Sequence, residues 1–75
     1  MEIPLGRIRL SRYQQGLSLD PQKLANAVNK ARRLGQVAPP ISVRRLPDGY
    51  LLLDGLYRLR AAQELGLEKI WALVE

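Results

Sequence analysis

The chain has 75 residues, with 12 lysines and arginines against 7 aspartates and glutamates, and a formal net charge of +5 at pH 7. It contains no cysteine and no histidine, which excludes disulfides and thiolate chemistry and argues against a hydrolytic triad or a zinc site. The basic excess is mostly arginine, the better bidentate ligand of phosphate, so it predicts an anionic partner. The alternative is an arginine-rich, solvated surface.

A chain of this length predicts one domain over residues 1–75 with a modest core. We therefore expect a partner, or self-association as a homodimer, to contribute to the stability of the folded chain. No stretch approaches the roughly 20 apolar residues that a membrane span needs, and Met1–Pro4 lacks the apolar region of a signal peptide. These features predict a soluble, cytoplasmic protein with no membrane partner.

The first half of the chain predicts a strand followed by a helix. Apolar residues alternate with arginine in Ile3–Leu10, which favours a short strand, and the polar segment Ser11–Gly16 is expected to be a connection. Asp20 and Pro21 are a typical N-cap and first helical residue, and Gly35 is a typical helix end. The apolar face of this helix is Leu24, Ala27, Val28, Ala31 and Leu34.

The second half predicts two strands, a helix and a last strand. Gln36–Pro40 cannot be helical because of its two prolines. The expected elements are the strand Ile41–Leu46, the turn Pro47–Gly49, the strand Tyr50–Leu53, the helix Gly55–Leu65 and the buried strand Ile70–Val74, with Tyr50 and Trp71 in the core. The order β-α-β-β-α-β predicts a small α+β (α/β) fold with a mixed sheet and a right-handed parallel crossover between the strands at Tyr50 and Val74.

The step from the strand Tyr50–Leu53 into the next helix predicts an anion site. Backbone N–H groups of Gly55, Leu56 and Tyr57, the positive end of the helix dipole and the guanidinium of Arg58 would gather at one point. The site would also lie beyond the carboxyl end of a strand, where ligands bind in open α/β sheets.

Arg58 falls on the buried arc of this helix, together with Leu59, Ala62 and Leu65. A buried charge is costly unless it is paired. Two explanations stay open. Arg58 is either an internal brace that pairs with Asp54, or a ligand for phosphate or sulfate resting on the first amides of the helix. Both can hold if Asp54 releases Arg58 to a ligand.

Other charged residues give weaker predictions. Arg44 and Arg45 point to opposite faces of one strand, so at most one of them can join a pocket, and a solvated edge is expected. Arg32–Arg33 ends a helix, where a capping role is favoured over recognition. Asp48 and Asp54 form no obvious dyad, so the residues predict no catalytic pair and no metal-ligand set.

Three segments in order carry a family resemblance: Ile8–Gln14, Leu24–Arg44 and Asp54–Ala62. The first looks like an opening strand and a Gln-bearing loop, the second like a helix followed by a glycine and a G-x-x-x-P-I-x-V-R stretch, and the third like a G-E-R-R-x-R-A phosphate motif. Together they resemble the N-terminal domain of ParB-type partition proteins, whose fold is shared with sulfiredoxin and ParB-like nucleases. The resemblance covers nearly the whole chain.

The resemblance implies a nucleotide site. In this site Arg58 and the first backbone amides of the helix would hold phosphate. Arg60 matches a second arginine of the family's arginine cluster. The residues expected to border the ligand are Gln14, Gln36 and Pro40. It further implies a nucleoside triphosphate with Mg²⁺ as the ligand, with Asp54 orienting Arg58 or the metal.

The chain also departs from the family pattern. Leu56 and Tyr57 stand where the partition proteins have glutamate and arginine, so the glutamate that the resemblance connects with CTP hydrolysis is missing. The absence of cysteine excludes sulfiredoxin chemistry. These substitutions favour binding over catalysis.

We therefore expect a ParB-like module that binds a nucleotide or other phosphate ligand and acts in a DNA-associated process. Two alternatives stay open. The first is a small ParB-like nuclease, phosphotransferase or NTPase. The second is a basic protein that binds DNA without sequence preference through Arg44 and Arg45.

Overall fold

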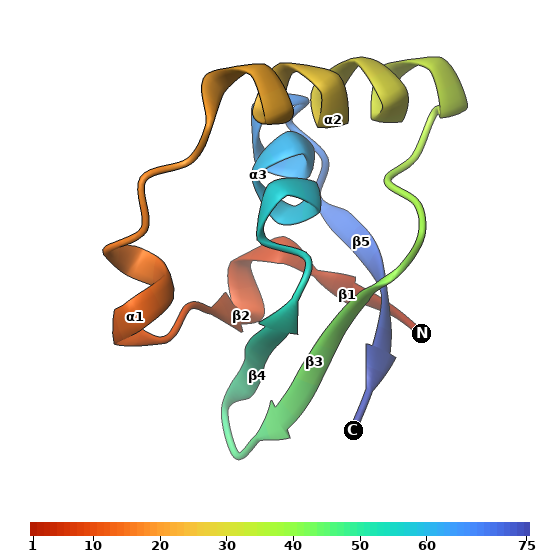
Figure 1. Cartoon of the computed structure of the whole chain (residues 1–75). Coiled ribbons are helices and arrows are strands. Elements are labelled where there is room, and N and C mark those ends of the chain that lie inside the picture. Colours follow the sequence, from red (N-terminus) through yellow and green to blue (C-terminus); the bar gives the residue numbers. More distant parts are fainter.

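The computed structural model describes residues 1–75 and has an α+β architecture with a five-stranded mixed sheet, as predicted (Figure 1). None of its helices has the length and apolarity needed to cross a membrane. The elements are β1 (Glu2–Pro4), the 3-10 turn η1 (Leu5–Arg7), β2 (Ile8–Arg9), α1 (Arg12–Gln15), α2 (Pro21–Leu34), β3 (Ile41–Leu46), β4 (Gly49–Asp54), α3 (Leu56–Glu64) and β5 (Lys69–Val74).

Both predicted helices are present with the expected boundaries. The side chain of Asp20 caps α2 by accepting a hydrogen bond from the backbone N–H of Gln22 at 2.9 Å. Gly35 ends this helix in the left-handed conformation, at φ 73°. Figure 1 shows α2 and α3 lying together on one side of the strands, with α2 outermost.

The strand order is β1-β5-β3-β4-β2, which corrects one prediction. β4 is antiparallel to β3, and β3 is parallel to β5, so β4 and β5 run in opposite directions and are not neighbours. The expected parallel crossover between the strands at Tyr50 and Val74 is therefore wrong; the parallel neighbour of β5 is β3, and that of β4 is β2. The reason is that the tight turn Pro47–Gly49 places β4 on one edge of β3 and leaves the other edge for β5.

The predicted first strand, Ile3–Leu10, is in fact two strands at opposite edges of the sheet. β1 pairs with β5, β2 pairs with β4, and only the three residues of η1 separate them. A flat sheet would hold its outer strands about 19 Å apart, whereas the four peptide units from Pro4 to Ile8 reach about 14 Å at most. The sheet must therefore curl, and η1 connects its two edges.

The core lies inside this curl, under the helices. Its largest fully buried side chains are Ile3, Ile41, Val43, Leu52 and Leu59. Side chains on β5 alternate between buried and exposed, so only one face of that strand is covered. Trp71, expected in the core, is 45% exposed, because it follows the buried Ile70 and so points to the uncovered face.

The segment Ser11–Gly16, expected to be a plain connection, contains the short helix α1. A capping box stabilises the start of this helix. The hydroxyl of Ser11 accepts a hydrogen bond from the backbone N–H of Gln14 at 3.1 Å, and Oε1 of Gln14 accepts one from the backbone N–H of Ser11 at 2.8 Å. The other end of the Gln14 side chain donates to the carbonyl of Leu52 on β4 at 3.0 Å, which ties α1 to the sheet.

Candidate functional site

The junction between β4 and α3 depends on Gly55. Its φ is 111°, a conformation that residues with a side chain rarely adopt. A Cβ atom at this position would lie 2.7 Å from Cγ2 of the fully buried Ile41. Gly55 therefore lets the chain leave the sheet directly above the core and begin a helix at Leu56.

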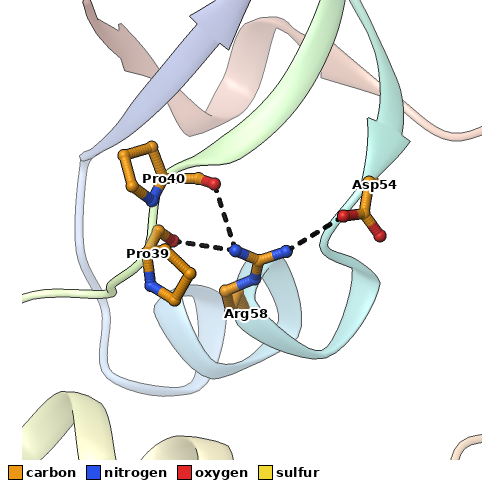
Figure 2. A network of polar contacts seen from close by, with 4 residues as sticks. All are labelled: Pro39, Pro40, Asp54 and Arg58. Carbon is orange, nitrogen blue, oxygen red and sulfur yellow. Dashed lines mark hydrogen bonds and ion pairs between the residues drawn. The ribbon is translucent and has the colours of Figure 1, made fainter.

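Arg58 braces this junction, as Figure 2 shows. Its Nη1 donates to the carbonyl oxygens of Pro39 at 3.0 Å and Pro40 at 3.1 Å, and its Nη2 lies 3.3 Å from Oδ2 of Asp54. The pairing with Asp54 agrees with the internal-brace explanation. The two carbonyl partners are not apparent from the sequence, because they come from the loop before β3.

The same guanidinium retains capacity for a ligand. Arginine has five N–H donors, and the bonds to Pro39, Pro40 and Asp54 leave Nε and one Nη2 hydrogen without a protein partner. The side chain is only 22% exposed, so its charge is poorly screened by water. Gly55, the N-cap of α3, supplies no side-chain acceptor to the first amides of that helix. These free donors and the helix dipole favour an anion beside Arg58.

A cleft of about 450 Å³ opens at this point. Its walls come from the β4–α3 junction and from the loop that precedes α2. The lining residues are Leu17, Ser18, Leu19, Asp54, Gly55, Leu56, Tyr57 and Arg58. The structure thus brings together the predicted phosphate-site residues and adds the loop Leu17–Leu19. Nothing in the sequence of that loop indicates that it lies against α3.

Tyr57 fixes the loop that forms the opposite wall. Its hydroxyl accepts a hydrogen bond from the backbone N–H of Asp20 at 2.8 Å. Asp20 follows the lining residues Leu17–Leu19 directly and is also the N-cap of α2. Tyr57, one of the two residues that depart from the family motif, therefore has a structural role here, since it anchors the cleft wall to α3.

Replacing Tyr57 by phenylalanine tests this role. We expect a loss of stability of about 1 kcal/mol, the typical net value of one hydrogen bond, and faster amide hydrogen exchange at Asp20. The matched control is Tyr13→Phe, because Tyr13 is 76% exposed and its ring lies at the protein surface. Equal exchange at Asp20 in both variants would contradict the anchoring role of Tyr57.

The remaining predicted ligand residues lie outside the cleft wall. Gln14 uses both ends of its side chain in bonds within the protein, Arg60 donates to Oε1 of Gln63 at 2.9 Å, and Gln36 is exposed. Pro40 adjoins the site through its carbonyl bond to Arg58. The ligand roles of these four residues stay predictions.

Arg44 and Arg45 lie far along β3 from the cleft, towards the β3–β4 turn. Arg45 lines a separate hollow of about 270 Å³ and lies 5.6 Å from the ring centre of Tyr50, a cation–π distance. Arg44 is exposed. Neither arginine joins the cleft. Both are exposed to solvent as expected, but β3 is the central strand of the sheet, so the expectation of an edge is wrong.

The sequence and the fold both match a known family. The model of the ParB N-terminal domain matches residues 1–75, so the chain belongs to the ParB N-terminal domain family.

Curated relatives include a probable chromosome-partitioning protein ParB from Pseudomonas putida, 34% identical over 73 residues, or 96% of this chain and 25% of that protein. An ATP-dependent L-serine kinase from Staphylothermus marinus is 39% identical over 56 residues, or 72% of this chain and 22% of the kinase. The chain thus spans about a quarter of the length of these relatives.

Solved structures show the same fold. Sulfiredoxin from Arabidopsis thaliana has a TM-score of 0.86 and 29% identity, and the match covers 100% of this chain and 82% of that one. C-terminally truncated ParB from Caulobacter crescentus complexed with CTP-γ-S has a TM-score of 0.84 and 31% identity, covering 100% of this chain and 43% of that one. The same ParB complexed to the centromeric parS site has a TM-score of 0.85 and covers 100% of this chain and 40% of that one.

Proposed function

We propose that this chain is a nucleotide-binding module that acts in a DNA-associated process and holds a nucleoside triphosphate in the cleft between Leu17–Leu19 and the start of α3. The observation that carries the proposal is the position of Arg58. Its guanidinium is fixed beside the uncapped N-terminus of α3 with two N–H donors left for an anion. The likeness to the ParB complexed with CTP-γ-S and to parS supports both parts of the proposal.

The lining of the cleft suits both parts of a nucleotide. Backbone amides and Arg58 would receive the phosphates, while Leu17, Leu19 and Leu56 supply an apolar wall. Magnesium in such sites is usually held by one or two carboxylates together with substrate phosphates. Asp54 is the acidic residue of the lining, and its side chain is 79% exposed, so it fits that role.

The test is calorimetric titration of the protein with ATP, CTP, GTP and UTP, each with Mg²⁺. We expect at least one nucleotide to bind, and Arg58→Lys to weaken that binding at least about tenfold, since lysine cannot make the same set of planar hydrogen bonds. The matched control is Arg32→Lys, an exposed arginine of α2 that does not line the cleft, and this variant should bind as the wild type does. A wild type that binds none of the four, or an Arg58→Lys variant that binds normally, would refute the proposal.

A second candidate is phosphotransfer or hydrolysis of the bound nucleotide. The likeness to the ATP-dependent L-serine kinase favours it. Within the cleft, Asp54 is the carboxylate that could orient a metal ion or a nucleophile. Nucleoside diphosphate released by the wild type but not by Asp54→Asn would support this candidate. Nucleotide bound without turnover would leave the binding module as the function.

A further inference from the structure

The outward side of α2 carries charged side chains of one sign only. This helix of 14 residues contains four of the chain's 12 lysines and arginines and none of its 7 acidic residues. At 100° per residue, Lys23, Lys30 and Arg33 fall within about 80° of one another. All three are exposed, and neither of the two ion pairs in the structure involves them. Asn26 falls within this arc and Asn29 about 40° outside it, and both are exposed.

The stability of α2 does not account for these charges. Cations in the last turn interact favourably with the helix dipole, which explains Arg33, but Lys23 lies in the first turn, where the dipole disfavours a cation. Lys23 also occupies the position at which a glutamate would complete a capping box with Asp20. Lys30 and Arg33 are neighbours of like charge three positions apart. The arrangement suits an external anion better than it suits the helix.

We infer that this surface, defined by Lys23, Lys30 and Arg33, binds the phosphate backbone of double-stranded DNA. From Lys23 to Arg33 the helix rises about 15 Å, a length of duplex that carries roughly nine phosphate charges. The amide side chains of Asn26 and Asn29 can donate further hydrogen bonds to phosphate oxygens. This surface is separate from the nucleotide cleft, and its binding of DNA does not depend on nucleotide there.

Other polyanions fit this surface less well. Single-stranded nucleic acid is usually held by aromatic side chains that stack on bases, and α2 has no aromatic residue. A helix that binds anionic membranes inserts an apolar face into the lipid. The apolar face of α2 is already packed inward, with Val28 and Ala31 buried. In Figure 1 α2 lies at the surface, beyond α3, where a long duplex can reach it.

The experiment measures binding to a short fluorescent duplex by anisotropy over a range of salt concentrations. We expect the triple variant Lys23→Gln, Lys30→Gln, Arg33→Gln to bind at least about tenfold more weakly than the wild type. The slope of log K against log salt should fall in magnitude by about 2.7, or about 0.9 for each phosphate that the variant no longer neutralises. Circular dichroism and thermal unfolding of the variant establish that it is folded, because glutamine keeps helix propensity.

The matched control removes the same charge from other elements, through Arg7→Gln, Arg12→Gln and Lys69→Gln, three exposed cations. This control should change the slope by less than about 1, and Arg58→Lys in the nucleotide cleft should leave it unchanged. An equal loss of affinity in both triple variants would show that affinity follows net charge and would overturn the assignment to α2. Single strands, or phosphatidylserine vesicles, bound as tightly as the duplex would also overturn it.

Discussion

Replacing Gly55 by alanine is expected to destabilise the protein by about 3 kcal/mol. A side chain at φ 111° is strained by about 1–3 kcal/mol. Its Cβ would also lie 2.7 Å from Cγ2 of Ile41, which is fully buried and cannot move aside without disturbing the core. For a domain of this size such a loss lowers the melting temperature by roughly 12–24 °C, which thermal unfolding followed by circular dichroism will measure.

Gly66, at the other end of α3, is the control for this substitution. Its φ is also positive, at 70°, but an added Cβ would meet nothing within 4 Å. Gly66→Ala should therefore cost only the backbone strain, about 1 kcal/mol. If both variants melt at the same temperature, the contact between residue 55 and Ile41 does not contribute to the effect.

Replacing Arg58 by alanine is expected to cost about 2 kcal/mol and to lower the melting temperature by roughly 8–16 °C. The loss comes mainly from the bonds to the carbonyls of Pro39 and Pro40, which join the loop before β3 to α3. The ion pair contributes little, because the side chain of Asp54 is 79% exposed to water.

The two contributions can be separated by a second substitution. Asp54→Asn removes the ion pair and keeps both carbonyl bonds, so we expect its melting temperature to fall by no more than about 4 °C. A larger fall in Asp54→Asn than in Arg58→Ala would show that the ion pair, and not the carbonyl bonds, holds the junction together.

Local signals in the sequence account for much of this fold. The Asp20–Pro21 start and the glycine at position 35 predict the boundaries of α2, and the strand Ile41–Leu46 is found as expected. Each depends on neighbours in the chain. The short helix α1 has an equally local signal, Ser11 followed three residues later by Gln14, and this capping-box pattern indicates the start of a helix rather than a plain connection.

Longer-range features could not be predicted in the same way. Alternating apolar residues show that a segment is a strand, but not which strands are its neighbours or which face is covered. The exposed position of Trp71 and the separation of β4 from β5 follow from such pairings. At the candidate site, the position of Arg58 on the buried arc of its helix predicts that its charge is paired, and the pairing with Asp54 is confirmed. The carbonyls of Pro39 and Pro40 and the loop Leu17–Leu19 reach the site only through the tertiary fold.

The short strands β1 and β2, at the two edges of the sheet, affect how readily the protein aggregates at high concentration. Unpaired backbone groups along a margin are templates for aggregation between molecules. β2 covers β4 only at Tyr50 and Leu51, and the next carbonyl of β4, that of Leu52, is taken by the side chain of Gln14. On the other side, β1 has three residues and ends at a proline. Little backbone is therefore left on which a second molecule could add a strand, so this chain is protected against strand-to-strand aggregation despite its small core.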